Sequence, residues 1–143
     1  MRIHFICTGN TYRSRMAEAY LNSKRLPAII VSSSGTYASE NLNGPISWVA
    51  AWVLKKNSLI GFMSSHWTLT TLDILNKADK VVFINDDNYE FCKNELNYDG
   101  VSYEVWNVLD IPVGLNGDVE IMKKALETYE QIQEKVGELI ASF

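Results

Sequence analysis

The sequence predicts an α/β protein in which a parallel sheet is covered by helices on both faces. Short segments rich in β-branched residues alternate with segments of helical period, and this order requires crossover connections between parallel strands. The clearest buried strand reads K-V-V-F-I at residues 80–84. The segment after Asp118 carries apolar side chains at helical spacing as far as Ile140. We therefore expect one domain spanning residues 1–143, with its ligand at the carboxyl ends of the strands.

The expected elements follow one another without a repeat or a linker. Four segments are expected to be strands: residues 3–6, 28–31, 80–84 and 102–106. Five segments are expected to be helices: residues 14–24, 45–56, 70 or 71 to 78, 86 or 87 to 94, and 118–140. Residues 32–44 are rich in serine, glycine and asparagine and are expected to form a loop. Pro45 is expected as the first helical residue after this loop, and Asp118 as the cap of the last helix.

The composition limits the class of protein. A net charge of -4 over 143 residues argues against binding to nucleic acid, and 47% hydrophobic residues fit a soluble domain. We see neither a signal peptide nor an apolar run that could span a membrane, so we expect a cytoplasmic protein without a membrane partner. Two cysteines (Cys7 and Cys92) and two histidines (His4 and His66) form no disulfide framework or metal cluster. We expect no metal and no cofactor.

The stretch C-T-G-N-T-Y-R-S, from Cys7 to Ser14, follows the first expected strand and leads into the first expected helix. Five residues separate Cys7 from Arg13, so the loop between them can curl until its backbone amides point at one centre. The helix N-terminus adds partial positive charge there, and the guanidinium of Arg13 offers a bidentate grip on an oxyanion. Gly9 and Asn10 are residue types that tolerate a positive φ in such a loop.

A cradle that binds an oxyanion also stabilises a thiolate. Thiols at helix N-termini beside a cation ionise readily, which makes Cys7 a candidate nucleophile, and the Ser14 hydroxyl can donate a hydrogen bond to its sulfur. The spacing alone does not decide the matter, because a cysteine at the end of a buried strand is often an inert small hydrophobe.

Four motifs in order resemble those of the low-molecular-weight protein tyrosine phosphatases. The stretch that begins at Cys7 resembles that family's C-x-G-N-x-C-R-S loop, and S-S-G-T at residues 33–36 stands where the family has S-A-G-T. Residues 78–84 resemble the family's third strand, and L-D-I-P at residues 109–112 resembles its D-P loop. The resemblance covers almost the whole chain. It implies a single-domain, three-layer α/β/α sandwich with a four-stranded parallel sheet in the order 2-1-3-4.

The resemblance also implies a mechanism through a phosphocysteine, without a metal. Cys7 is then the nucleophile, and Arg13 clamps the equatorial oxygens of the phosphoryl group. The implied phosphate-binding residues are Thr8, Gly9, Asn10, Thr11, Tyr12 and Ser14. The implied loop-supporting residues are Asn10 and Ser33, together with the Ser14 hydroxyl.

Asp110 is the expected general acid, by resemblance to the aspartate of the D-P loop. The match is altered, because Ile111 separates this aspartate from the proline. In a second alignment, D-I-P at residues 110–112 matches a D-I-P that some bacterial members carry just before their D-P. The position of the acid then falls on Val113. The motif around V-L-D and the acidic start of the last helix favour Asp110.

Two positions inside the loop region depart from the family. Tyr12 replaces a second loop cysteine that in relatives can form a protective disulfide, and Cys92 lies in a predicted helix where we expect a structural role. Arg15 replaces the proline that usually follows R-S. We expect Arg15 either to add positive charge at the rim of the pocket or to be solvated.

The resemblance leaves the substrate open between several classes. Phosphotyrosine in proteins is the first expectation, with Tyr37 and Tyr12 as aromatic walls. Protein arginine phosphatase is the alternative, because Thr11 matches bacterial members of that kind. A phosphate-binding protein of low turnover is a third possibility, whereas an arsenate reductase would need more cysteines. The expected partner is a phosphorylated protein or peptide, and the chain is expected to be a monomer or weak dimer.

Overall fold

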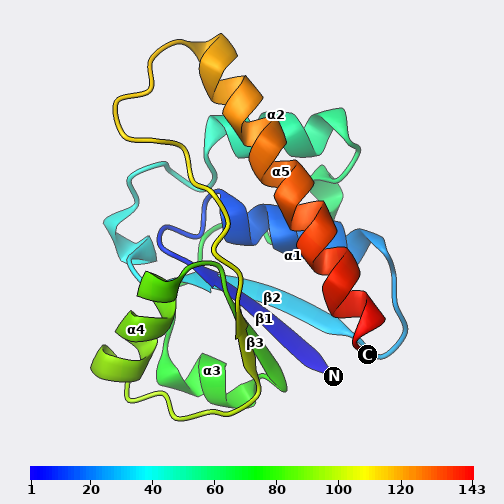
Figure 1. Ribbon diagram of the computed structural model, residues 1–143, viewed down its shortest axis with the longest axis vertical. Helices are drawn as coiled ribbons and strands as arrows, with labels where there is room; N and C mark the ends of the chain where they lie inside the picture. The colour runs from blue at the N-terminus through cyan, green and yellow to red at the C-terminus, as the bar shows by residue number, and fades with distance from the viewer.

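Four parallel strands form the central sheet of the computed structural model, which describes residues 1–143 (Figure 1). The strands are β1 (Arg2–Cys7), β2 (Ile30–Gly35), β3 (Lys80–Phe83) and β4 (Tyr103–Val105). They lie in the order β2-β1-β3-β4, with every neighbouring pair parallel. The α/β fold class and the strand order that we expected from the sequence are therefore confirmed.

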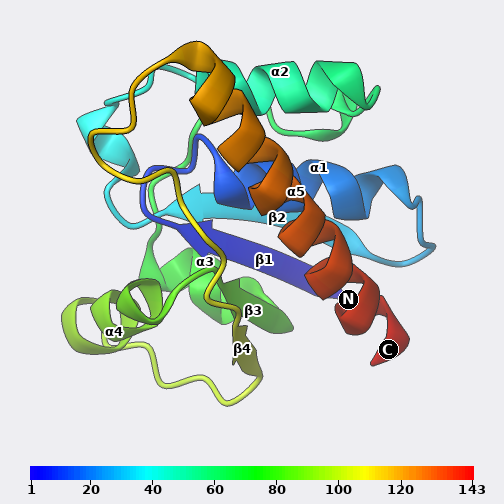
Figure 2. The ribbon, with the colours of Figure 1, turned by 45° about the horizontal axis from the view of Figure 1, so that its top comes forward.

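Helices cover both faces of this sheet, as Figures 1 and 2 show. On one face lie α1 (Arg13–Ser23), α2 (Trp48–Lys56) and α5 (Asp118–Ala141). On the other face lie α3 (Leu72–Lys77) and α4 (Asp86–Glu95). Two short 3₁₀ turns, Ala38–Glu40 and Ile60–Phe62, complete the structure. None of the helices is both long enough and apolar enough to cross a membrane.

The core is split in two by the sheet, because successive side chains of a strand point to opposite faces. Ile3 and Phe5 of β1 belong to the larger cluster, beneath α1, α2 and α5, and the ring of Phe5 lies 5.4 Å from that of Trp106. Ile6 of β1 and Phe83 of β3 belong to the smaller cluster, beneath α3 and α4. The alternation places Cys7, the last residue of β1, on the face that α1 covers.

The second strand differs from its prediction. It runs over Ile30–Gly35 rather than residues 28–31, so the serines expected to open a loop are strand residues paired with β1. Their hydroxyls explain the difference: the Ser32 and Ser34 oxygens each lie 2.7 Å from a ring nitrogen of His4. A polar ladder, in which His4 and Ser34 are buried, thus takes the place of the apolar side chains that mark most strands. Ala28, placed in the strand by prediction, has a φ of 64° in the preceding turn.

The starts of three helices also differ from prediction. Helix α2 begins at Trp48, three residues after the proline, because the Ser47 hydroxyl caps it by accepting from the Ala50 N–H at 3.2 Å. Asn85, rather than an aspartate, caps α4 and forms a capping box with Asn88. Asp118 is the first residue of α5 rather than its cap, a position that Gly117 takes with a φ of 88°.

Candidate active site

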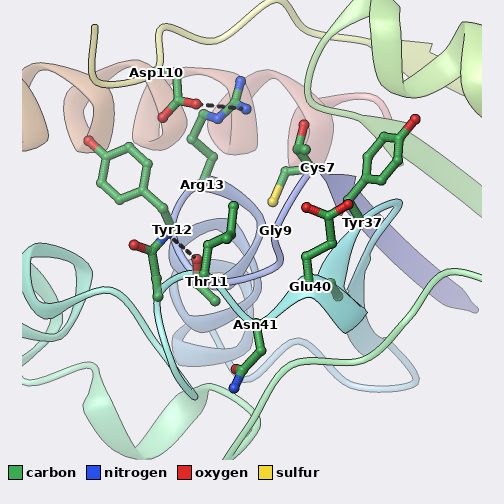
Figure 3. A pocket seen from close by; sticks show the side chains of 13 residues that line it. Cys7, Gly9, Thr11, Tyr12, Arg13, Tyr37, Glu40, Asn41 and Asp110 are labelled. Carbon is green, nitrogen blue, oxygen red and sulfur yellow. Dashed lines mark hydrogen bonds and ion pairs between the residues drawn. The ribbon is translucent and has the colours of Figure 1, made fainter. Parts of the chain in front are cut away.

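The residues from Cys7 to Arg13 join the carboxyl end of β1 to the start of α1, and they form the floor of a pocket of about 470 Å³ (Figure 3). The walls come from the segment after β2 and from the loop before α5. The lining residues are Cys7, Thr8, Gly9, Thr11, Tyr12, Arg13, Tyr37, Ala38, Glu40, Asn41, Leu42, Asn43 and Asp110. The pocket therefore lies at the carboxyl edge of the sheet, where ligands of such folds bind.

The backbone of this phosphate loop (residues 7–14) is held from outside by its carbonyl groups. Four carbonyls accept hydrogen bonds from surrounding residues: Cys7 from the Thr36 N–H at 3.0 Å, Thr8 from the Tyr37 N–H at 2.8 Å, Asn10 from the Arg15 guanidinium at 3.1 Å, and Thr11 from the Ser47 N–H at 2.9 Å. In a trans peptide the N–H points opposite to the carbonyl. The amides that follow these four carbonyls are therefore directed toward the inside of the loop, where they can donate to an anion.

The loop needs one left-handed residue and one close approach. Asn10 has a φ of 57°, as expected for an asparagine in a tight turn, whereas Gly9 has no positive φ. The glycine that the loop does require is Gly35, at the end of β2. A Cβ there would lie 2.6 Å from the Thr8 carbonyl oxygen and 2.7 Å from the Asn10 nitrogen.

The side chain of Asn10 orients the hydrogen bonds that reach the sulfur. Its Oδ1 accepts from the Thr68 N–H at 2.8 Å, so its Nδ2 donates to Ser14 Oγ at 2.8 Å and to Ser33 Oγ at 2.9 Å. Ser14 Oγ, which accepts from Asn10, is then free to donate to Cys7 Sγ at 2.9 Å. The backbone N–H of Asn10 also donates to Cys7 Sγ, at 3.3 Å. Two hydrogen-bond donors therefore converge on the sulfur of Cys7.

Arg13 brings positive charge to the wall of the pocket. Its Nη1 donates to the Val108 carbonyl at 3.1 Å, and its Nη2 lies 3.3 Å from Asp110 Oδ2 (Figure 3). Asp110 stands at the mouth, with its Oδ1 accepting from the Ile111 N–H at 2.8 Å. Val113, which the second alignment put in the place of the acid, is fully exposed and does not line the pocket.

The two tyrosines expected as walls lie differently from each other. Tyr12 lines the pocket but is buried in the core cluster under α5, and burial raises its pKa to about 12. Tyr37 is half exposed, and its ring tilts against that of Phe91 at 5.1 Å. Thr11 is buried at the pocket, where its hydroxyl accepts a long hydrogen bond of 3.4 Å from Asn43. Only Tyr37 therefore offers an accessible aromatic surface.

Both expectations for Arg15 were wrong. Its side chain is fully buried behind the loop rather than at the rim or in solvent, and it donates to carbonyl groups there. Cys92, in contrast, lies where we expected it, buried in α4, and burial raises the pKa of its thiol to about 12. No cluster of three or more histidine, cysteine, aspartate or glutamate side chains that could hold a metal ion is present.

Sequence reasoning missed two residues of this site. Asn88 of α4 is buried and donates from Nδ2 to the Thr8 hydroxyl at 3.2 Å, which ties the far helix layer to the phosphate loop. Glu40 ends the 3₁₀ turn after β2 and directs its carboxylate into the pocket near Tyr37 (Figure 3). The run of polar residues after β3 was a signal for Asn88. No signal in a serine- and asparagine-rich loop distinguishes Glu40 from a solvated glutamate.

The fold and this loop define a class of α/β protein in which a cysteine ends the first strand at the floor of a pocket. The chain belongs to the low molecular weight phosphotyrosine protein phosphatase family, whose model matches residues 2–143. A protein-arginine-phosphatase of Bacillus subtilis is 27% identical over 98% of this chain and 92% of its own length.

Two further relatives have names that differ from each other. A protein-arginine-phosphatase of Geobacillus stearothermophilus is 45% identical over 58 residues, which make up 41% of this chain and 38% of that protein. The solution structure of a low molecular weight protein tyrosine phosphatase from Bacillus subtilis is 25% identical, with a TM-score of 0.76, and the match covers 99% of this chain and 98% of that one. The family is thus shown, while its members' names divide between two phosphorylated residues.

Proposed function

We propose that this chain is a cysteine-dependent phosphatase that removes the phosphoryl group from phosphoarginine side chains of proteins. The observation that carries the proposal is the composition of the pocket walls around Cys7. They present the carboxylates of Glu40 and Asp110 and the hydroxyl of Thr11, with Arg13 as the only cation among the lining residues. This arrangement suits a substrate that carries an anionic phosphoryl group on a cationic guanidinium.

The first step transfers the phosphoryl group to the protein. Cys7 Sγ attacks phosphorus, the S–P bond forms, and the P–N bond breaks with its electron pair remaining on the guanidine nitrogen. That nitrogen takes a proton from Asp110 in its protonated form, so the arginine side chain leaves as an ordinary guanidinium. The inward amides and Arg13, which keeps N–H donors beyond its contacts with Val108 and Asp110, stabilise the equatorial oxygens.

The second step regenerates the thiolate. Asp110, now a carboxylate, accepts a proton from a water molecule whose oxygen attacks phosphorus, and the S–P bond breaks with its electron pair returning to Cys7. Inorganic phosphate leaves the pocket. The Ser14 hydroxyl, directed to the sulfur by Asn10, stabilises the departing thiolate.

Two observations support a guanidinium substrate. A carboxylate on the wall attracts a cationic group and repels an additional anion, and Glu40 supplies that carboxylate beside the substrate. The relatives from Bacillus subtilis and Geobacillus stearothermophilus named above are protein-arginine-phosphatases.

Phosphotyrosine is the second candidate, and Tyr37 is the observation that favours it. Its half-exposed ring lines the pocket and offers one aromatic face to a phenyl ring. The opposite wall is less suitable, because the ring of Tyr12 is buried in the core cluster.

The test compares two peptides of one sequence that differ only in phosphoarginine or phosphotyrosine. We expect a higher kcat/KM for the phosphoarginine peptide, and we expect Cys7→Ser to abolish release of phosphate from both. Glu40→Gln should lower kcat/KM for phosphoarginine by roughly tenfold, the effect of losing one charge-assisted hydrogen bond, and leave phosphotyrosine little changed. A preference for phosphotyrosine would overturn the substrate assignment. No release from either peptide, nor from para-nitrophenyl phosphate, would overturn the enzyme and leave a phosphate-binding protein.

A further inference from the structure

Arg15 forms an unusual contact behind the phosphate loop. Its guanidinium is fully buried, and its Nη1 donates to the carbonyls of Asn10 at 3.1 Å and Pro45 at 2.9 Å. Its Nη2 donates to the Ser64 carbonyl and lies 3.6 Å from the sulfur of Met63. One side chain thus fastens the phosphate loop to two other segments, the one before α2 and the one after the turn Ile60–Phe62.

The counter-charge of Arg15 is held at a distance. Glu18, one turn along α1, has its Oε1 4.0 Å from Nε of Arg15, and that Nε has no hydrogen-bond partner. The carboxylate is instead satisfied by neutral donors: Ser33 Oγ at 2.6 Å, the Ser64 N–H at 3.1 Å and Ser64 Oγ at 3.0 Å. The two buried charges therefore lie close together but do not form a bidentate, hydrogen-bonded salt bridge.

Hydrogen bonds connect both Arg15 and Glu18 to Cys7 by way of Asn10. Arg15 holds the carbonyl of Asn10, and Glu18 accepts from Ser33, which accepts from the Asn10 side chain. The same side chain directs the Ser14 hydroxyl toward the sulfur. A cation and an anion thus lie behind the site on the same hydrogen-bonded network, with opposite effects on an anion in the loop.

We propose that Arg15 is a positioning residue of the phosphate loop, which anchors Asn10 from behind and whose positive charge, opposed by that of Glu18, favours the anionic sulfur and the bound phosphoryl group. The proposal rests on the proposed function, because it takes Cys7 as the nucleophile. It assigns a role to a residue that stands where other members of the family usually have proline, a side chain without charge or donor.

The charged groups around Arg15 give the sign of each effect. Burial lowers the pKa of Arg15, while Glu18 on α1 and Cys7 at the end of β1 both act to raise it. Opposite charges attract, so the cation behind the loop stabilises a negative charge held inside it. Pro45, Met63 and Ser64 bring no charged side chain to the contact. On the pocket side, the charged residues that line the pocket with Cys7 are Arg13, Asp110 and Glu40, and none of them is altered in the variants of Arg15 and Glu18.

The experiment measures the rate of alkylation of Cys7 by iodoacetate as a function of pH. Arg15→Met keeps the bulk of the side chain and removes its charge, so we expect the pH midpoint of alkylation to rise by about one unit, with about tenfold slower reaction below the midpoint. Glu18→Gln leaves the cation unopposed and should lower the midpoint. A merely structural role predicts a loosened loop, and hence a higher midpoint, in both variants. Equal midpoints, or shifts in one direction, would overturn the proposal.

Two more variants keep the outcome decisive if Arg15→Met does not fold. The double variant Arg15→Met, Glu18→Gln leaves no unpaired buried charge and must have a higher midpoint than Glu18→Gln alone. Arg15→Lys keeps the charge and must lie closer to the unaltered chain than Arg15→Met does. A double variant no higher than Glu18→Gln, or a lysine variant no closer than the methionine variant, would contradict the role of the charge.

Protection by inorganic phosphate separates this proposal from the proposed function. If phosphate does not slow alkylation of Cys7 in the unaltered chain, the phosphate site itself is refuted. If phosphate protects but the variants do not differ in sign, only the role of Arg15 is refuted. Cys92 does not interfere, because it is fully buried and its pKa is raised to about 12.

Discussion

Arg13 and Asp110 form an ion pair across the mouth of the pocket, with 3.3 Å between Nη2 and Oδ2. Arg13 is 4% exposed and Asp110 is 57% exposed, so the pair joins a buried cation to a carboxylate in contact with water. An ion pair open to solvent on one side contributes little to stability, and variants of Asp110 should therefore fold. The pair leaves Asp110 free to face a substrate that enters above Cys7.

Replacement of Asp110 by asparagine should lower the rate of hydrolysis most for substrates with poor leaving groups. Asparagine keeps the size but cannot donate the proton, so we expect kcat for phenyl phosphate to fall by roughly 10²- to 10⁴-fold. para-Nitrophenyl phosphate has a better leaving group, so kcat for this substrate should fall less. The measurement is kcat for both substrates at one pH.

The matched control is Val113→Ala, on the same loop. Val113 is fully exposed and outside the pocket, so this variant should keep the activity of the unaltered chain. If the asparagine variant hydrolysed phenyl phosphate as fast as the unaltered chain, Asp110 would not be the general acid, as the second alignment of the D-P loop implies.

The fold was predictable because its signals are local or depend on order alone. We can recognise three such signals without knowing any long-range contact: the β-branched residues of β1 and β3, the helical period of α5, and the alternation of strand and helix. The bounds of the second strand were only partly predictable, because Ser32 and Ser34 form hydrogen bonds with His4, a partner some thirty residues away in the sequence. Polar strands that depend on such a partner look like loops in a sequence.

The site was predictable where one stretch supplies it. Cys7, Arg13 and Ser14 stand in one motif, and the structure brings them together at the end of β1. The environment of Arg15 was not predictable, because its carbonyl partners at Pro45 and Ser64 are distant in the sequence and backbone acceptors leave no mark on residue identity. Arginine is mostly exposed in proteins, so the sequence alone gives no reason to place this one in the interior.

A methyl group at Gly35 should damage the phosphate loop. The added Cβ would lie 2.6 Å from the Thr8 carbonyl oxygen and 2.8 Å from the Gly9 carbonyl carbon, and backbone atoms cannot yield as a flexible side chain does. We expect Gly35→Ala to cost about 1–3 kcal/mol in the free energy of unfolding, and to lower kcat/KM for para-nitrophenyl phosphate as well. Urea unfolding and steady-state kinetics measure the two effects.

Gly137→Ala provides the opposite result as a control. Gly137 lies inside α5, where an added Cβ meets nothing within 4 Å. Alanine is favoured over glycine in a helix by roughly 0.5–1 kcal/mol, so this variant should be slightly more stable and equally active. If both glycine variants behaved alike, the close approach of the phosphate loop to Gly35 would be refuted.

Removal of the Ser14 hydroxyl should reduce turnover without emptying the pocket. Ser14→Ala deletes the donor 2.9 Å from Cys7 Sγ and leaves one N–H of Asn10 without its acceptor. A hydrogen bond to a charged group contributes about 1.5–3 kcal/mol, so kcat should fall by roughly ten- to a hundredfold. Ser23→Ala, at the far end of α1, removes only a bond to the Tyr20 carbonyl and should leave kcat unchanged. An unchanged kcat in the Ser14 variant would exclude its hydroxyl from thiolate stabilisation.

His4 should make the protein sensitive to acid. Burial lowers the pKa of this β1 residue from 6.5 to about 4, and its two ring nitrogens lie 2.7 Å from the hydroxyls of Ser32 and Ser34. Below pH 6.5 the unfolded chain binds a proton at this residue that the folded chain does not bind until about pH 4. The free energy of unfolding should therefore fall as the pH drops through this window, by roughly 2–3 kcal/mol from this residue alone at pH 4.5. Above pH 6.5 the residue should make no pH-dependent contribution.

The test compares urea unfolding of the unaltered chain with that of His4→Gln, at pH 7 and at pH 4.5. Glutamine keeps hydrogen-bonding groups near both serines but does not titrate, so it should be the less stable protein at pH 7 and lose less stability between the two pH values. Carboxylates titrate in both proteins and cancel in the difference. Equal losses in the two proteins would show that His4 is protonated in the folded state, and that the serine ladder of β2 accommodates an imidazolium.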